Sequence, residues 1–140
     1  MEKLGKQTIK FNVPPVITSV ASIVGPKEAN GPLSSYFDQC LDDEFWGEKT
    51  WEKSESKIIK ETVNMAISKS GIASSDIEYC FAGDLLNQCI SSSFGLRELN
   101  IPFLGIFGAC STFVEGLSLG AVMTEACSKH VLCAASSHFC

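Results

Sequence analysis

The alternation of helical and strand-like segments from residue 51 onward constrains the fold more than any other feature. Apolar residues at one-face helical spacing predict a helix over residues 51–70, which Gly71 ends. Strand candidates follow at residues 77–82, 101–107 and 131–136, with helix candidates at residues 85–99 and 111–128 between them. Strands that alternate with helices form right-handed crossovers. We therefore predict an α/β fold with a mainly parallel sheet.

The first 50 residues give weaker signals. Residues 7–13 alternate as a strand does, up to Pro14 and Pro15, and residues 16–24 form a second apolar run. Two Gly-Pro pairs predict a loop over residues 25–32. Residues 33–46 are ambiguous, and we expect a short helix followed by a loop.

The segment 111–128 is apolar around nearly its whole circumference, and Gly116 and Gly120 permit close backbone approach. A helix that is apolar all round is a buried one, so this helix needs cover on the side away from its own sheet. Glu115 would then require a partner. The continuous apolar run 101–107 is typical of a strand buried on both faces. We expect residues 1–140 to form the N-terminal domain of a larger protein, and we expect the other half of that protein to lie outside this sequence.

Composition and charge exclude several function classes. Hydrophobic residues make up 45% and charged residues 19%, and the net charge of −5 includes no basic stripe, so nucleic acid is excluded as a partner. The longest apolar stretches are shorter than the ~20 residues that span a membrane. Seven cysteines without a signal peptide indicate reduced thiols, and the absence of a C-x-x-C pair argues against a structural zinc or other metal site.

Candidate site residues follow the predicted strands. Ligands of open α/β sheets bind beyond the carboxyl ends of the strands. The polar or nucleophilic side chains expected at those ends are Asp84 and Asn87, Cys110 and Ser111, and His138.

Cys110 lies between a predicted strand and a predicted helix N-terminus. The free backbone N–H groups and the dipole of such a helix favour negative charge, which suits either a reactive thiolate or a bound carboxylate. The alternative is a structural cysteine that fills space. Asp84 either caps the next helix or contacts a ligand, and His138 is either a base or ligand donor, or an ordinary loop residue.

Several motifs together resemble the stage V sporulation protein AD family, whose members are thiolase-like proteins of spore-forming bacteria. The segment Gly108-Ala109-Cys110-Ser111-Thr112 resembles the nucleophile turn of thiolases and ketoacyl synthases. The remaining matching segments are residues 25–28, 31–33, 82–88, 101–103 and 136–138. The resemblance runs from about residue 5 to residue 138 and covers about the first half of that family's length.

The resemblance implies a thiolase-like fold, in which this chain is the N-terminal half of a duplicated αβαβα sandwich and the helix 111–128 is central. It also implies binding of dipicolinic acid, alone or as its calcium chelate, in a pocket equivalent to a thiolase active site. Members support its uptake into the developing spore with membrane proteins of the same operon. The location implied is the cytoplasm or forespore, peripheral to the inner spore membrane, and homodimers are common among thiolases.

Thiolases complete their site with residues from the C-terminal half, so these residues alone do not support catalysis, and no cofactor is expected. We therefore favour a binding protein over an enzyme. One alternative is an acyltransferase with Cys110 as nucleophile and His138 as base. The other is a structural scaffold for the membrane complex.

Overall fold

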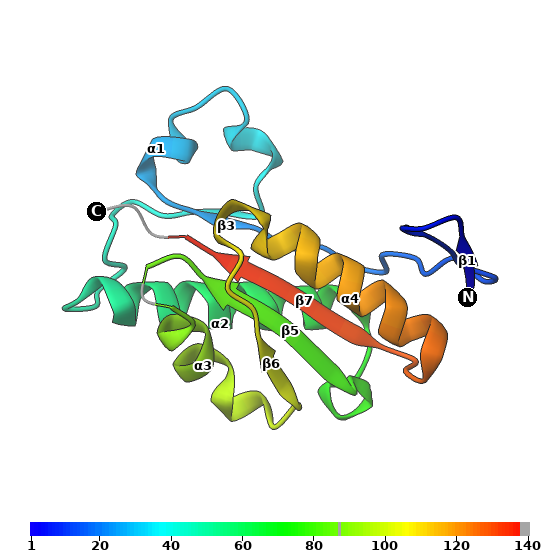
Figure 1. Ribbon diagram of the computed structural model, residues 1–140. Coiled ribbons are helices and arrows are strands. Elements are labelled where there is room, and N and C mark those ends of the chain that lie inside the picture. Colours follow the sequence, from blue (N-terminus) through cyan, green and yellow to red (C-terminus); the bar gives the residue numbers. More distant parts are fainter. Residues whose placement is uncertain (87, 138–140) are drawn as a thin grey trace.

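The computed structural model describes residues 1–86 and 88–137 and has an α/β architecture (Figure 1). A three-stranded sheet contains β5 (Tyr79–Asp84), β6 (Phe103–Gly105) and β7 (Val131–Ser136) in the order β6-β5-β7. Both pairings are parallel, with Cys80 opposite Phe103 and Leu132. The predicted α/β class and parallel sheet are confirmed, whereas the duplicated thiolase-like sandwich stays a prediction.

Helices cover both faces of this sheet. The helices α2 (Trp51–Ser70) and α3 (Ile90–Leu96) lie on one face, and α4 (Thr112–Ala126) lies on the other (Figure 1). The predicted bounds of α2 are confirmed: the Thr50 side chain accepts a hydrogen bond from Lys53 N, and Gly71 ends the helix with φ 68°. The core lies between α2, α3 and the sheet and contains Ile59, Val63, Cys80, Ala82 and Leu96.

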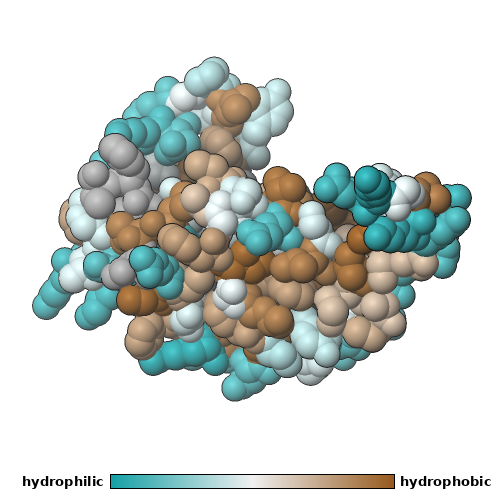
Figure 2. Space-filling view, in the orientation of Figure 1, coloured by the Kyte–Doolittle hydropathy of each residue, from teal (hydrophilic) through white to brown (hydrophobic). Residues whose placement is uncertain are grey.

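The helix α4 packs on the sheet through its small residues. Gly116 and Gly120 are buried against β5 and β7, whereas Phe113, Val114 and Leu119 are exposed. Apolar residues gather across the middle of this side of the molecule (Figure 2). The outer side of α4 is therefore apolar and uncovered among the described residues, which agrees with a helix that needs cover from outside this sequence, and its burial in a larger protein stays a prediction. Glu115 is exposed as well, because it lies on the side of α4 away from the sheet.

The strand β6 also differs from its prediction. Only Phe103–Gly105 pair, and Leu104 and Gly105 are exposed. The reason is the strand order, which places β6 at an edge of the sheet, with β5 as its one hydrogen-bonded neighbour among the described strands. Continuous apolar sequence alone did not distinguish an edge strand from a central one.

The first 50 residues form short elements around this sheet. The predicted strand 7–13 is shorter, and β2 (Thr8–Lys10) pairs antiparallel with β1 (Glu2–Leu4). From the run 16–24 only β3 (Ile23–Val24) pairs, in parallel with β4 (Gln39–Cys40). The predicted loop 25–32 contains α1 (Pro26–Ala29), because Pro26 suits the first helical turn, and the short helix expected next is a 3-10 turn, Ser34–Tyr36. The remaining 3-10 turns are Ser74–Asp76, Arg97–Leu99 and Ala109–Ser111.

The N-terminal hairpin is fastened to the far end of α4. Glu125 pairs with the Met1 amino group at 2.7 Å and accepts backbone hydrogen bonds from Asn12 and Val13. These contacts, the N-terminal ammonium first, lower the pKa of Glu125. Among residues 1–86 and 88–137, no helix has the length and apolarity needed to cross a membrane.

Candidate functional site

Three strand ends meet at the carboxyl edge of the central sheet. Asp84, the last residue of β5, is in register with Ser136, the last residue of β7, and Ala82 pairs with Gly105 at the end of β6. Because all three strands are parallel, the segments that follow them leave from the same edge. The predicted parallel strands thus end at one edge of the sheet, and a ligand site formed there by Asp84, Cys110 and Ser111 stays a prediction.

Cys110 lies in a tight turn just before α4. The turn Ala109–Ser111 is held by Ser111 N and Ser111 Oγ, which donate to the Gly108 carbonyl at 3.0 and 2.7 Å. Thr112 Oγ1 donates to the Ala109 carbonyl at 2.8 Å and accepts from Gly108 N at 3.1 Å. Ala109 has φ 49°, a left-handed conformation that costs a non-glycine residue about 1 kcal/mol or more and that concentrates at functional sites.

The turn presents Cys110 to solvent. The thiol is free and exposed, and α4 begins two residues later than Cys110, at Thr112. Among the described residues, no histidine or carboxylate is hydrogen-bonded to the Cys110 thiol. The Glu115 carboxylate lies over Gly108, one turn into α4, and adds a negative charge beside the turn. The described residues thus offer an accessible thiol next to helix N-terminal N–H groups.

Asp84 is fully buried and caps α3. Its Oδ2 accepts hydrogen bonds from Ser92 N and Ser92 Oγ, both at 2.8 Å. Ser92 is the third residue of α3, so Asp84 satisfies a helix N-terminal N–H group from a neighbouring strand. Of the two roles weighed for Asp84, capping is confirmed. The predicted helix 85–99 starts only at Ile90, because Gln88 and Cys89 have positive φ values of 51° and 69°.

The other predicted site residues divide into two groups. Ser111 is exposed and is used in the Cys110 turn. Asn87 and His138 lie outside the described residues.

Sequence reasoning missed Glu55, which lies in the same region. Glu55 is on α2, is 1% exposed, and its Oε1 accepts a 2.9 Å hydrogen bond from Ser136 Oγ. Burial raises the pKa of Glu55, the nearby Ser136 and Ser91 hydroxyls lower it, and the charge of Asp84 raises it again. A signal was available: Glu55 stands four residues before Ile59, so it occupies the apolar face of α2.

Two other thiols are structural. Burial raises the pKa of Cys80 to about 12 and that of Cys133 to about 11. The Cys133 thiol donates to the Gly116 carbonyl at 3.2 Å, between β7 and α4. Both act as small core residues, and neither competes with Cys110 as a reactive group.

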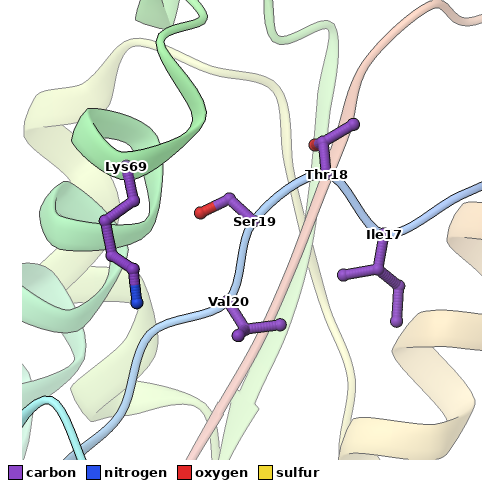
Figure 3. A pocket seen from close by; sticks show the side chains of 5 residues that line it. All are labelled: Ile17, Thr18, Ser19, Val20 and Lys69. Atoms are coloured by element: carbon purple, nitrogen blue, oxygen red, sulfur yellow. The ribbon is translucent and has the colours of Figure 1, made fainter.

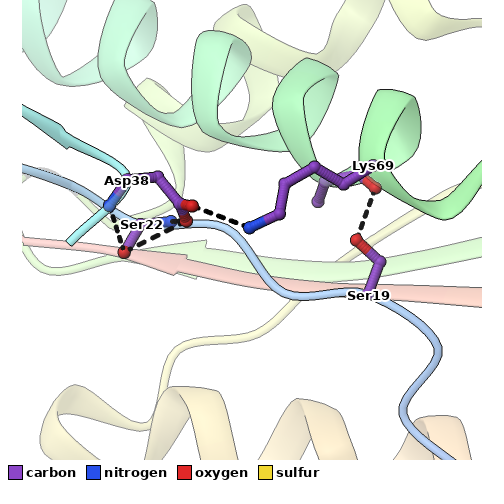
Figure 4. A network of polar contacts seen from close by, with 5 residues as sticks. Ser19, Ser22, Asp38 and Lys69 are labelled. Carbon is purple, nitrogen blue, oxygen red and sulfur yellow. Dashed lines mark hydrogen bonds and ion pairs between the residues drawn. The ribbon is translucent and has the colours of Figure 1, made fainter. Parts of the chain in front are cut away.

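A shallow depression of about 310 Å³ lies elsewhere, at the C-terminal end of α2, and is lined by Ile17, Thr18, Ser19, Val20 and Lys69 (Figure 3). Figure 4 shows that Lys69 pairs with Asp38 at 2.7 Å, while Asp38 also accepts from Ser22 N at 2.9 Å. Ser19 Oγ donates to the Ala66 carbonyl at 2.7 Å. These contacts fasten the extended segment to α2 and lower the pKa of Asp38, chiefly through Lys69.

That depression is separate from the carboxyl edge of the sheet. Lys69 and Glu55 stand 14 residues apart on α2, which corresponds to about 21 Å of helix. Because the Lys69 ammonium is already engaged by Asp38, the depression offers no unpaired charge from that side chain. The strand ends therefore remain the candidate functional site.

Comparison with known proteins gives two matches. The family model for stage V sporulation protein AD matches residues 5–140. Stage V sporulation protein AD of Bacillus subtilis (strain 168) is 40% identical over 139 residues, which are 99% of this chain and 41% of that protein. The chain thus spans about two fifths of the length of this curated relative.

Proposed function

Because the chain belongs to the stage V sporulation protein AD family, we propose that it is a sporulation protein that binds dipicolinic acid or its calcium chelate. The binding site is the carboxyl edge of the central sheet, in a pocket equivalent to a thiolase active site. Binding supports uptake of the ligand into the developing spore, together with membrane proteins of the same operon. The protein acts at the periphery of the inner spore membrane, and it pairs into a homodimer.

The observation that carries this proposal is the convergence of three strand ends beside the start of α4. Asp84 and Ser136 end neighbouring strands, and the chain leaving β6 leads to the exposed Cys110 turn. The first N–H groups of a 15-residue helix favour an anion. A dicarboxylate matches that field, and the Cys110 thiol and the Ser111 hydroxyl stand next to it.

The acyltransferase alternative needs a base for Cys110. No described histidine or carboxylate is hydrogen-bonded to this thiol, so that role would fall to His138, outside the described residues. The acyltransferase alternative therefore depends on His138. The scaffold alternative predicts partner binding without a small ligand.

The test is calorimetric titration of dipicolinate, with and without calcium, into the complete gene product that contains these residues. The variants are Cys110→Ala and, as a matched control, Cys127→Ala, whose exposed thiol follows the other end of α4. Saturable binding that weakens in Cys110→Ala and stays unchanged in Cys127→Ala supports the proposal.

Two other outcomes contradict the binding proposal. Absence of binding, with acylation of Cys110 by an acyl-coenzyme A, establishes the acyltransferase. Absence of binding with retained association to the membrane proteins establishes the scaffold.

A further inference from the structure

A buried polar cluster joins four elements beneath the carboxyl edge of the sheet. It consists of Glu55 on α2, Asp84 at the end of β5, Ser91 and Ser92 at the start of α3, and Ser136 at the end of β7. Glu55 is 1% exposed, and Asp84, Ser91 and Ser92 are each 0% exposed. Asp84 and Ser136 are themselves the last residues of β5 and β7, at the carboxyl edge of the sheet where the ligand is proposed to bind.

The hydrogen bonds within this cluster are incomplete. Asp84 Oδ2 accepts from Ser92 N and Oγ, and Glu55 Oε1 accepts from Ser136 Oγ. Glu55 Oε2 and Ser91 Oγ are buried, and neither has a hydrogen-bond partner among the described residues. Glu55 is 1% exposed and shares the cluster with the fully buried Asp84, so ionisation of Glu55 would bury a second negative charge and is unfavourable here.

The packing of α2 against α3 brings the two unpartnered groups together. Gly95 lies so close to α2 that a Cβ there would stand 2.5 Å from the Ser56 carbonyl oxygen and 2.8 Å from Ile59 Cγ2. Ser91 and Glu55 stand four residues before Gly95 and Ile59, one turn back on each helix. The Ser91 hydroxyl consequently faces the Glu55 carboxyl. It lowers the pKa of Glu55, against the larger effect of burial, which raises that pKa.

We propose that Glu55 carries a proton in the folded protein, donates it to Ser91 Oγ, and thereby keeps the carboxyl edge of the sheet receptive to an anionic ligand. A hydrogen bond from the protonated Glu55 Oε2 to Ser91 Oγ gives each of these two unpartnered atoms a partner. The ligand part rests on the proposed function, whereas the proton on Glu55 does not. Glu55 is a positioning residue, since it acts on the ligand through the Asp84 and Ser136 strand ends.

The charges around Glu55 agree with this proton. Among the described residues, the charged groups that act on Glu55 are Asp84 on β5 and Glu52 on α2 itself, and both raise its pKa. Facing Glu55, α3 and β7 contribute the neutral hydroxyls of Ser91 and Ser136. A second full negative charge beside Asp84 would repel a dicarboxylate, so ligand affinity is linked to the proton.

Infrared difference spectroscopy of the complete gene product tests the proton without any ligand. The wild-type minus Glu55→Gln spectrum should contain a carboxylic acid band that persists above pH 4.5, the ordinary pKa of a Glu side chain. Ser91→Ala should shift the frequency of that band, because its hydrogen-bond acceptor is lost. In the control Glu52→Gln the band should remain, and it should disappear at a lower pH than in the wild type, because removal of the Glu52 charge lowers the pKa of Glu55. Loss of the band near pH 4.5, or its absence at every pH, overturns the proposal.

Calorimetric titration of dipicolinate over about pH 5 to 9 tests the link to the ligand. The wild-type Kd should rise above the Glu55 pKa, approaching about tenfold per pH unit, whereas Glu55→Gln should bind with little pH dependence. Equal pH profiles for the two proteins overturn the link. If the wild-type protein binds no dipicolinate at any pH, the proposed function fails, and the infrared result alone decides the proton.

Discussion

Two buried helical glycines should respond to alanine with opposite signs. Gly95 is in α3 and faces α2, whereas Gly116 is in α4 and faces the sheet. In a helix interior, alanine is favoured over glycine by about 1 kcal/mol. Whether each substitution raises or lowers the free energy of unfolding then depends on the space for one methyl group.

The space at Gly95 is insufficient. Its Cβ would be 2.5 Å from the Ser56 carbonyl oxygen, whereas real Cβ atoms essentially never come closer than 3.0 Å and ordinary contact begins at 3.4 Å. The helix α3 must therefore move away from α2 by about 0.5–0.9 Å. Overpacking of this kind costs about 1–3 kcal/mol, and the obstacle here is backbone rather than a flexible side chain. After the propensity gain, Gly95→Ala should destabilise the protein by about 1–2 kcal/mol.

The space at Gly116 is adequate. The nearest atoms to its Cβ would be Ile106 Cδ1 and the Phe81 carbonyl oxygen, both at 3.6 Å. Gly116→Ala should therefore keep most of the helix-propensity gain and stabilise the protein by about 0.5–1 kcal/mol.

Denaturant unfolding of the wild-type protein and both variants measures their free energies of unfolding, which should differ by about 1.5–3 kcal/mol between the two variants. Thermal unfolding should show the Tm of Gly95→Ala lowered by about 2–8 °C. A Gly95→Ala protein as stable as the wild type would refute the close approach of α3 to α2, and with it the facing positions of Glu55 and Ser91. Destabilisation by Gly116→Ala would refute the packing of α4.

Three further outcomes are expected. Asp84→Ala should cost about 1–3 kcal/mol in denaturant unfolding, because it leaves the buried N–H of Ser92 without an acceptor, while the Ser92 hydroxyl still reaches the Cys89 carbonyl at 3.2 Å. Asp84→Asn, which keeps one acceptor oxygen, should cost less, and equal losses would contradict the capping role. At neutral pH a maleimide should label Cys110 rapidly and leave Cys80 and Cys133 unlabelled until the protein unfolds, and mass spectrometry of peptides checks this. The 140-residue chain by itself should self-associate through the exposed apolar face of α4, and a monodisperse monomer in sedimentation velocity would count against that.

Local sequence signals predicted the elements whose pattern is long or whose ends are marked. The helix α2 has a continuous apolar face, a Thr50 cap and Gly71 at its end, and its bounds match the prediction. The strand β7 also matches, because a short apolar run lies between polar turn residues. Strand and helix alternation was sufficient for the parallel sheet, since the handedness of crossovers leaves few other arrangements.

Errors arose where a neighbour in space decided the outcome. The apolar run around β6 gave no information on which strands would flank it, so its edge position was missed. The start of α3 moved to Ile90 because the left-handed conformations of Gln88 and Cys89 interrupt the helix before it, and Asp84 on another element then accepts from Ser92 N.

The sequence by itself determined the α/β class, the main helix, and a parallel sheet whose strands end at one edge, because periodicity and strand direction are local properties. Only the tertiary structure decided that Glu55 belongs to the same region. Its carboxyl comes from a helix some 30 residues before Asp84, and its unpartnered oxygen results from burial between elements that no local pattern connects.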